Sequence, residues 1–353
     1  MMRAGKGEAE KKIRMLTEKT KQLRTILEVN KKILMSSPLS QLLSYIVYSA
    51  INLLKADAGT LRLADRRENV LLLKTSVGTR RAPHTRRLPI DENSIAGRTF
   101  LRGKPIKCLN ISRSSLYPWN GVETEKFTSL LTVPLKKGNI NLGVFSIYTK
   151  KRRNFSRLDM EIIKIFASQV TLAIINRNYL EKVYQAAITE DLTGLYNQRY
   201  LYKRLEEEIN RARRFNHFLS LIFIDLDNLK KINDSFGHLA GDKILKRISK
   251  IVRESIRKID LPARYGGDEI VVILPETDTS SAYVLAERIR KRVENTFSGT
   301  NFSVTVSIGV ATYPEHSLEK MDLLHKADLA MYVAKQRGKN RVVSLSSRES
   351  ITF

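Results

Sequence analysis

Cysteine is almost missing from this sequence of 353 residues, because Cys108 is the only one. A single thiol excludes an internal disulfide and a zinc site built from several cysteines, and it is typical of a reducing compartment. Long hydrophobic runs are missing too: residues 42–54 form the longest, which includes two serines and an asparagine and is too short to span a bilayer. The charged N-terminus lacks a signal-peptide hydrophobic region. We therefore expect a cytoplasmic protein without a transmembrane segment.

Acidic residues are scarce beside basic ones, 36 against 62, which gives a formal net charge of +26. The excess lies mainly in residues 1–190, with 35 Lys and Arg against 15 Asp and Glu, whereas residues 191–353 carry 27 against 21. Such a charge attracts nucleic acids and anionic lipids, but no helix-turn-helix, zinc-finger or basic-zipper pattern accompanies it. We interpret it as a solvated surface and expect no specific nucleic-acid partner. Weak contact of the basic N-terminal half with membrane or nucleic acid stays an open alternative.

The length is enough for two domains, and 42% hydrophobic with 28% charged residues is a globular composition. Residues 8–35 are highly charged and carry apolar residues at helical, partly heptad spacing before the Ser-Ser-Pro of residues 36–38. This pattern predicts a short N-terminal helix and dimerising coiled coil over residues 1–37.

Residues 38–180 have the pattern of one domain of mixed helix and strand. A helical repeat covers residues 42–54, two strands lie within 59–77, a hairpin lies within 129–148, and a long helix over 157–187 closes the domain. Helix, antiparallel hairpins and closing helix describe an α+β domain of sensor size. Its short motifs resemble those of GAF domains and occur in the order Ser94-Ile-Ala-Gly-Arg, Gly103-Lys-Pro-Ile, Ser129-Leu-Leu-Thr-Val-Pro-Leu, Gly143-Val and Phe155-Ser.

The resemblance to GAF domains implies a small ligand, a chromophore or a dimerisation role, but the residues do not identify a ligand. Cys108 lies in a strand-like segment with no histidine after it, so we interpret it as a structural thiol. His84, alone in a basic loop, is poor support for haem or a metal. The GAF ligand is therefore unknown.

Residues 181–190 continue the closing helix without a Gly/Pro-rich linker, which predicts a stiff signalling helix. From residue 191 to 346 helices and strands alternate, with a strand over 219–227, a hairpin turning at a Gly-Gly pair and a helix over 322–337. This order predicts an α+β domain with a ferredoxin-like or palm-type sheet backed by helices. Residues 347–353 are left as a C-terminal tail.

Acidic residues stand at two strand ends of this second domain. Asp225 and Asp227 are two apart, so both should point to one face, and Asp268 and Glu269 stand at the hairpin tip. If the two strands pair, Asp225 and Asp268 can converge on one hard cation, Mg²⁺ or Mn²⁺. Each pattern alone is more often a turn, a helix cap or an exposed edge, but their joint occurrence predicts metal-assisted phosphoryl or nucleotidyl transfer.

Phosphate contacts are predicted beside these acids. Gly266 and Gly267 have no Cβ, so a polyphosphate could approach their backbone N–H groups closely. Lys335 and Lys339, which the helical pattern places one turn apart, could neutralise phosphate charge. Taken alone, the two lysines would be a solvated helix face.

The same residues resemble the GGDEF family of diguanylate cyclases over about residues 187–346. The motifs occur in family order: Asp191-Leu-Thr-Gly-Leu-Tyr-Asn, Asp225-Leu-Asp-Asn-Leu-Lys-Lys-Ile-Asn-Asp-Ser-Phe-Gly-His, Gly241-Asp242, Arg264-Tyr-Gly-Gly-Asp-Glu-Ile, Ser307-Ile-Gly-Val-Ala and Ala327-Asp-Leu-Ala-Met-Tyr-Val-Ala-Lys-Gln-Arg-Gly-Lys-Asn-Arg. The resemblance implies a homodimer that condenses two GTP into cyclic di-GMP and releases two pyrophosphates. Each domain would hold one GTP, whose ribose 3′-hydroxyl attacks the partner's α-phosphate.

The resemblance also implies a role for individual residues. Asp225, the Leu226 carbonyl and Asp268 would hold Mg²⁺, and Glu269 would sit near the attacking hydroxyl. The remaining contacts to GTP would be Asn233 and Asp242 at the guanine edge, Gly266 and Gly267 along the phosphates, and Lys335 and Lys339 at the terminal phosphates.

A separate product site is implied by Arg257 and Asp260, because GGDEF cyclases with Arg-x-x-Asp nine residues before the Gly-Gly pair resemble one another in binding product there. Arg257 can bind a phosphate or the guanine Hoogsteen edge, and Asp260 can accept from guanine N1–H and N2–H₂. The alternative is that Arg257 is a solvated helix-end charge and Asp260 forms a turn.

Some residues depart from the family pattern. Ile270 stands where Phe is usual, Asn228 and Leu229 stand where His-Phe is usual, and Lys339 replaces a usual Arg.

We expect a diguanylate cyclase regulated by its GAF half. The alternative is a GGDEF protein with weak or no turnover that acts as a receptor for GTP or cyclic di-GMP.

Overall fold

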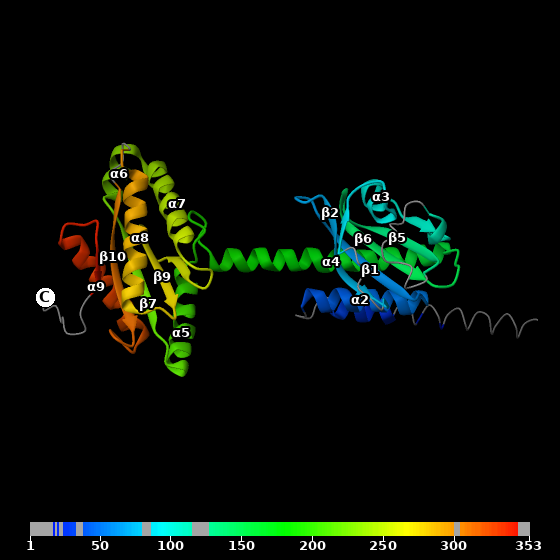
Figure 1. Cartoon of the computed structure of the whole chain (residues 1–353), viewed down its shortest axis with the longest axis horizontal. Coiled ribbons are helices and arrows are strands. Elements are labelled where there is room, and N and C mark those ends of the chain that lie inside the picture. Colours follow the sequence, from blue (N-terminus) through cyan, green and yellow to red (C-terminus); the bar gives the residue numbers. More distant parts are fainter. Residues whose placement is uncertain are drawn as a thin grey trace, which may run out of the picture. The chain divides into compact units, whose positions relative to one another are not determined.

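The computed structural model describes residues 17, 20, 24–32, 38–79, 86–114, 127–299 and 304–344. The chain divides into two compact units, Met1–Glu181 and Lys182–Phe353 (Figure 1). Both combine helices with one mainly antiparallel sheet, so the prediction of two α+β domains is confirmed. Residues 24–32 are helical; most of the predicted coiled coil over 1–37, His84 and the tail 347–353 lie outside the described residues.

The N-terminal unit is built on a six-stranded antiparallel sheet with the order β3-β2-β1-β6-β5-β4. Its elements are α2 (Leu39–Leu54), β1 (Ala58–Asp65), β2 (Val70–Val77), β3 (Arg87–Pro89), α3 (Ile95–Arg102), β4 (Ile106–Cys108), a 3₁₀ turn (Ile111–Arg113), β5 (Ser129–Lys137), β6 (Ile140–Thr149) and α4 (Arg157–Ile188).

The two faces of this sheet follow the period of two along each strand. Odd-numbered residues such as Leu61, Leu131 and Phe145 pack in one core with α2 and α4. Even-numbered residues face the other way, where Phe100 of α3 packs on Val144. Cys108 is half-buried and packs against a small apolar cluster that includes Ile95, Ile111 and Leu130, which agrees with a structural thiol.

The C-terminal unit has a five-stranded sheet with the order β11-β10-β7-β9-β8, in which only β10 and β11 are parallel. Its elements are α5 (Gln198–Phe215), β7 (Leu219–Asp227), α6 (Leu229–Phe236), α7 (His238–Ser255), β8 (Leu261–Arg264), β9 (Glu269–Pro275), α8 (Thr279–Phe297), β10 (Thr305–Tyr313), α9 (Lys320–Gln336) and β11 (Val342–Ser344).

Helices cover both faces of this second sheet, and its central strand β7 is buried along its whole length (Figure 1). Even-numbered residues of β7, such as Ile224, pack with α7 and α8. Odd-numbered residues, such as Phe223, pack with α5 and α9. Asp225 and Asp227 continue the odd-numbered series, so they end the strand on the α5 and α9 side. No described helix is both long and apolar enough to cross a membrane.

Candidate nucleotide and metal site

The acidic residues meet at one edge of the sheet because β7 and β9 pair antiparallel. Asp225 lies directly opposite Glu269 in the register, and the Leu226 N–H donates to the Asp268 carbonyl over 3.3 Å. The predicted pairing of the two strands is therefore confirmed. It brings the Asp225 side chain, the Leu226 backbone and the Asp268–Glu269 tip to one place.

Asp225 is buried, with 3% of its surface exposed, and its Oδ2 lies 2.6 Å from Lys335 Nζ. The pKa of Asp225 is raised to about 6, mainly by burial and also by the negative charges of Asp268 and Glu269, while Lys335 lowers it. Lys335 reaches this point because α9 packs tightly on β10: a Cβ on Gly309 would stand 2.0 Å from the Ala327 carbonyl oxygen.

Glu269 is half-buried beside Asp225, and burial is the main cause that raises its pKa. Asp268 and Asp328 add to this rise, whereas Lys335 opposes it. Asp328, on α9, is itself half-buried with a raised pKa caused by burial, and the sequence analysis missed it. Its signal was the spacing of seven residues, two helical turns, before Lys335.

The Gly266–Gly267 turn differs from expectation in one detail. A Cβ on Gly266 would stand 2.3 Å from Glu269 Oε2, so the missing side chain makes room for that carboxylate. At Gly267 a Cβ would meet nothing within 4 Å. Close approach by a ligand is therefore open at Gly267, while Gly266 already accommodates a group of the chain itself.

Arg264 stabilises this turn through hydrogen bonds to its carbonyls, a role that the sequence analysis did not predict. Its guanidinium donates to the Gly266 and Gly267 carbonyls, the latter at 2.7 Å, and its Nη1 donates to Glu190 Oε1 at 2.9 Å. Glu190 also accepts from the Thr193 hydroxyl and from the Leu192 and Thr193 amides. Burial raises the pKa of Glu190, but these hydrogen bonds, that of the Thr193 hydroxyl foremost, and the charge of Arg264 lower it overall. The segment just after α4 is thus tied to the Gly-Gly turn by one arginine.

Asn233 and Asp242 stand together where α6 meets α7. A Cβ on Gly241 would lie 2.0 Å from Asn233 Oδ1, so the glycine lets the asparagine side chain pack against α7 at the residue before Asp242. Asn233 Oδ1 is buried and has no hydrogen-bond partner among the described residues. A buried acceptor without a partner is costly unless a ligand supplies a donor.

Lys339 does not lie one helical turn after Lys335, so that prediction is wrong. Helix α9 ends at Gln336, and Gly338 and Lys339 both have positive φ, 105° and 62°. Lys339 Nζ donates to Asn228 Oδ1 over 2.7 Å. The lysine therefore reaches the end of β7 from a turn and not from the helix face.

Arg257 and Asp260 line a different cavity of about 320 Å³, together with Arg253, Gln185 and Thr189. Asp260 is 8% exposed; its Oδ2 accepts from the Arg257 N–H at 2.7 Å, while its Oδ1 is buried without a partner among the described residues. Burial raises the pKa of Asp260. Asp260 therefore does form a turn, as the alternative held, but it keeps one acceptor oxygen unused.

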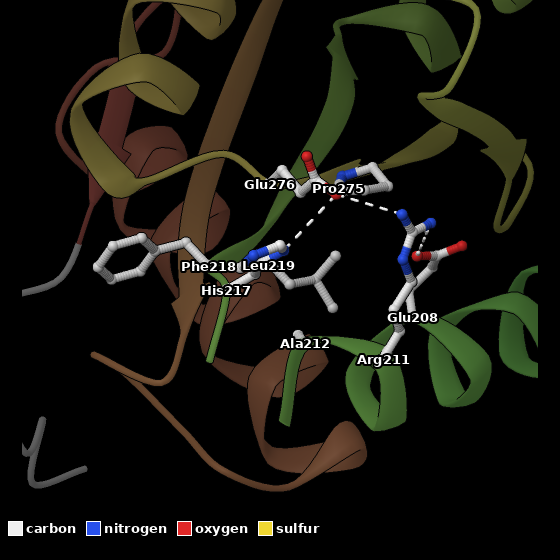
Figure 2. A pocket seen from close by; sticks show the side chains of 8 residues that line it. All are labelled: Glu208, Arg211, Ala212, His217, Phe218, Leu219, Pro275 and Glu276. Carbon is white, nitrogen blue, oxygen red and sulfur yellow. Dashed lines mark hydrogen bonds and ion pairs between the residues drawn. The ribbon is translucent and has the colours of Figure 1, made fainter. Parts of the chain in front are cut away.

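A second cavity lies at the opposite end of β7 and β9, near Leu219 and Pro275 (Figure 2). It measures about 10 Å³, which is about the size that holds one water molecule. Glu276 is paired there with Arg211 at 3.2 Å and His217 at 3.6 Å. Its size excludes a nucleotide.

The end of the central strand of this helix-backed sheet therefore brings Asp225, Glu269 and Lys335 together. Residues 187–341 match the family model described as diguanylate cyclase, GGDEF domain, and residues 36–175 match that of the GAF domain. Residues 187–341 are therefore a GGDEF domain, and a GAF domain precedes it in the chain.

Its relatives include Diguanylate cyclase A of Treponema denticola, 38% identical over 218 residues that cover 60% of this chain and 58% of the relative. Response regulator PleD of Caulobacter vibrioides is 41% identical over 176 residues, 47% of this chain and 38% of the relative. The crystal structure of the GGDEF domain of YfiN (TpbB) from Pseudomonas aeruginosa is 36% identical, with a TM-score of 0.42, covering 44% of this chain and 98% of that domain. The chain thus spans between 38% and 58% of these curated relatives' length.

Proposed function

We propose that this chain is a diguanylate cyclase, which condenses two GTP into cyclic di-GMP and releases two pyrophosphates. The observation that carries the proposal is the meeting of Asp225, Glu269 and Lys335 at the buried end of β7, with Asp268 one residue from Glu269. Carboxylates for a cation and an ammonium for phosphates in one place suit transfer of a nucleotidyl group, where catalysis is mostly positioning and charge stabilisation.

The donor set at this strand end fits Mg²⁺ or Mn²⁺. Among the described residues no three His, Cys, Asp or Glu side chains gather as a metal site. Asp225, Asp268 and the Leu226 carbonyl offer instead two carboxylates and one neutral oxygen, and Mg²⁺ typically binds one or two carboxylates together with substrate phosphates. When bound, the ion would neutralise charge on the α-phosphate and the leaving pyrophosphate.

The base would be bound where α6 meets α7. The unpartnered Asn233 Oδ1 supports this, because guanine carries amino and imino donors that a buried acceptor can use. Asp242, next to Gly241, would accept from guanine N1–H and N2–H₂. Adenine has no such pair of donors on that edge, so these two residues would select GTP.

The reacting groups would be served by Glu269 and the two lysines. Glu269 has a raised pKa and lies at the tip beside Asp225, which suits a group that accepts the proton of a 3′-hydroxyl. Lys335 and Lys339 would neutralise the terminal phosphates, the first from α9 and the second from the turn after it.

Two bound GTP require two copies of the chain, and α4 offers a surface for pairing. Leu158, Ile165, Leu172 and Tyr179 repeat every seven residues, and their exposed fractions are 55%, 39%, 45% and 67%. An exposed apolar seam with this period is typical of helices that pair.

Leu172→Glu should shift the chain from dimer to monomer in light scattering and reduce turnover, while Lys164→Glu, outside the seam, should do neither. A dimer that persists in Leu172→Glu would contradict this interface.

Regulation by the GAF half would reach the site through the end of α4. Glu190, two residues after this helix, is bonded to Arg264 and so to the Gly266–Gly267 turn. The cavity at Arg257 and Asp260 is also lined by Gln185 of α4. Product bound there would contact the same segment, which supports feedback inhibition outside the GTP site.

The function is tested by incubating the purified chain with GTP and Mg²⁺ and separating the products by chromatography. We expect cyclic di-GMP from the wild type and none from Asp225→Asn. Tight binding of GTP or cyclic di-GMP without any product would favour the alternative function, a receptor, and would overturn the proposed enzyme.

A further inference from the structure

The turn after α9 holds three consecutive residues with positive φ: Gly338 at 105°, Lys339 at 62° and Asn340 at 44°. Residues with a side chain rarely adopt this region, and they persist there only when surrounding contacts hold the backbone. Because Lys339 is one of the proposed phosphate-binding residues, the contacts that hold this turn should affect the binding of GTP. The inference therefore rests on the proposed function.

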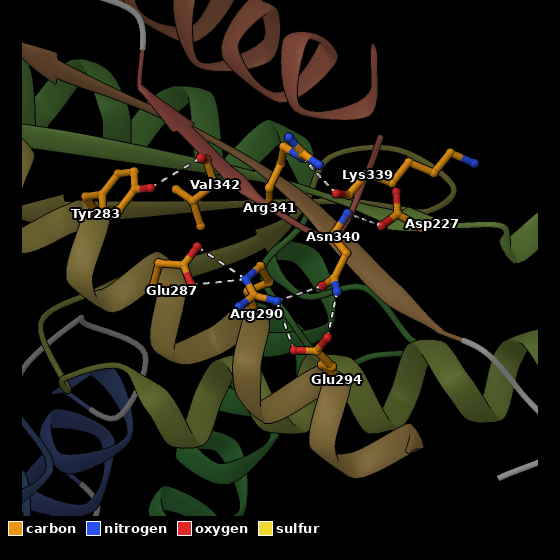
Figure 3. Close-up of polar contacts among 9 residues, drawn as sticks. All are labelled: Asp227, Tyr283, Glu287, Arg290, Glu294, Lys339, Asn340, Arg341 and Val342. Atoms are coloured by element: carbon orange, nitrogen blue, oxygen red, sulfur yellow. Dashed lines mark hydrogen bonds and ion pairs between the residues drawn. The ribbon is translucent and has the colours of Figure 1, made fainter. Parts of the chain in front are cut away.

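Asn340 is the residue through which the fold holds the turn (Figure 3). Its N–H donates to Asp227 Oδ2 at 3.1 Å. Its side-chain amide accepts from Arg290 Nη1 at 2.9 Å and donates to Glu294 Oε1 at 2.7 Å. Arg290 is itself paired with Glu294 and, on its other side, with Glu287. Asn340 thus bonds through its backbone to β7 and through both ends of its amide to α8.

Asp227 is the second component, and its surroundings differ from those of Asp225. It is 1% exposed and accepts from Ser307 Oγ at Oδ1 (2.8 Å) and from Thr305 Oγ1 at Oδ2 (2.7 Å), in addition to the Asn340 N–H. Three donors of the chain itself therefore occupy this carboxylate. The two acids of the Asp-x-Asp pattern consequently have different tasks: Asp225 meets Lys335, and Asp227 joins β7, β10 and the turn.

A further contact ties the same two segments together. Asn228, the residue after Asp227, accepts at Oδ1 from Lys339 Nζ over 2.7 Å. Residues 227 and 228 therefore contact residues 340 and 339, and the end of β7 sets where the Lys339 ammonium lies relative to Asp225. A lysine offers one compact charge on a flexible stem, unlike the rigid fork of an arginine, so its action on a phosphate depends strongly on where the backbone holds it.

We propose that Asp227 and Asn340 are positioning residues for Lys339, which hold its left-handed turn against the end of β7 without touching nucleotide or metal. Such a positioning role makes two demands on variants of these residues, that is, it predicts two results that a metal-binding or merely structural role does not predict. The effect of losing Asn340 must vanish once Lys339 is gone, and Asp227 must be replaceable by a neutral residue that makes the same hydrogen bonds.

The first demand is tested on the full chain with 3′-deoxy-GTP and Mg²⁺, a nucleotide that lacks the attacking hydroxyl and so binds without reacting. Calorimetry should show that Lys339→Ala raises the Kd by about tenfold. Asn340→Gly removes the amide and tolerates the positive φ, and it should raise the Kd by about as much. The double variant should bind no more weakly than Lys339→Ala alone. Glu287→Gln, which changes only the far side of Arg290, is the matched control and should bind as the wild type does.

The second demand is tested at Asp227. In Asp227→Asn the amide can keep all three contacts, because the Ser307 hydroxyl can accept as well as donate. This variant should keep the wild-type Kd and the wild-type Mg²⁺ dependence of turnover, whereas Asp227→Ala should weaken 3′-deoxy-GTP binding. If Asp227→Ala does not fold, as judged by circular dichroism, Arg290→Lys, which loses the contact to Asn340 Oδ1, takes its place with the same expected rise in Kd.

The outcomes separate this inference from the function it rests on. Failure of the wild type to bind 3′-deoxy-GTP, or an unchanged Kd in Lys339→Ala, overturns the proposed phosphate site and the positioning role with it. The positioning role alone is overturned if Lys339→Ala binds 3′-deoxy-GTP more weakly while Asn340→Gly keeps the wild-type Kd. It is also overturned if the two increases in Kd multiply in the double variant. Loss of Mg²⁺-dependent turnover in Asp227→Asn, as in Asp225→Asn, would make Asp227 a metal ligand and would also overturn it.

Discussion

Lys335 Nζ and Asp225 Oδ2 lie 2.6 Å apart, a distance at which the ammonium and the carboxylate share a strong hydrogen bond. The carboxylate that we assign to the metal is therefore also the anchor of the lysine that we assign to the phosphates. Burial of Asp225 makes this pairing important, because a buried carboxylate needs a cation beside it to stay ionised. We therefore expect binding of the metal ion at Asp225 and binding of the nucleotide phosphates at Lys335 to be coupled.

Asp268→Asn should abolish cyclase activity while the fold stays intact. Asp268 is half-buried and stands just before β9, outside the strand, so its loss removes a metal ligand without disturbing the buried strand core. Turnover of GTP, with circular dichroism as a check on folding, measures this. Near-wild-type turnover by the purified variant would show that the site is assigned wrongly.

The pKa of Asp225 predicts a pH dependence of stability in metal-free buffer. Burial raises this pKa from 3.8 to about 6, so between these values the folded chain binds more protons than the unfolded chain. The contribution of Asp225 to stability is therefore present at acidic pH and is lost as pH rises from about 4 to about 6. The change amounts to a few kcal/mol at most, at about 1.4 kcal/mol per pKa unit.

Urea unfolding of the wild type and of Asp225→Asn, with a chelator present across this pH range, isolates the effect. The difference in free energy of unfolding between the two proteins should change with pH in favour of the variant as pH rises. A difference that stays constant from about pH 4 to about pH 7 contradicts the raised pKa.

GTP should be strongly preferred over ATP. An unpaired Asp242 carboxylate facing adenine would cost a few kcal/mol, so kcat/KM for ATP should be lower by about a hundredfold or more. Initial rates with each nucleotide and Mg²⁺ give the ratio. Comparable rates with the two nucleotides would contradict the assignment of the base site to Asn233 and Asp242.

Product should inhibit without competing with GTP, because Arg257 and Asp260 line a cavity whose residues do not include Asp225. Arg257→Ala should accumulate more cyclic di-GMP at long times with little change in the initial rate. Lys250→Ala, an exposed substitution on the same helix as Arg253, is the matched control and should be inhibited as the wild type is. Calorimetric binding of product that stays tight in Arg257→Ala/Asp260→Ala would place the product elsewhere.

Arg264→Lys should lower kcat by about tenfold or more with the fold preserved, because the compact ammonium of a lysine lacks the planar fork that reaches two carbonyls and a carboxylate from one position. Glu190→Gln keeps an acceptor for Arg264 and should have a smaller effect. The two substitutions should be coupled in a double-mutant cycle of initial rates. Strictly multiplicative effects would mean that the end of α4 and the Gly-Gly turn do not communicate through this pair.

Much of the site could be predicted because its signals are local. The period of two along β7 puts Asp225 near the end of this strand, and the Gly-Gly turn that joins β8 to β9 puts Glu269 at the start of β9. The helical period of α9 likewise brings one lysine, Lys335, to this edge. Patterns of this kind can be recognised from residues that are close together in the sequence.

The remainder depends on contacts between segments distant in sequence. Two adjacent acids, Glu190 and Asp191, look equivalent in the sequence, and only the turn geometry shows that Glu190 meets Arg264, 74 residues away. The partners of Asp227 come from β10 and from residue 340. The place of Lys339 had a local signal that we missed: Gly338, in the left-handed region, stands where a helix commonly ends.

The most direct test of the central claim is the stoichiometry of the reaction. Phosphorus NMR of the purified chain with GTP and Mg²⁺ follows substrate, pyrophosphate and cyclic dinucleotide in a single sample. We predict two pyrophosphates for each cyclic di-GMP, and no change in the spectrum with Asp225→Asn. Release of inorganic phosphate in place of pyrophosphate, or an unchanged GTP signal with the wild type, would contradict the account.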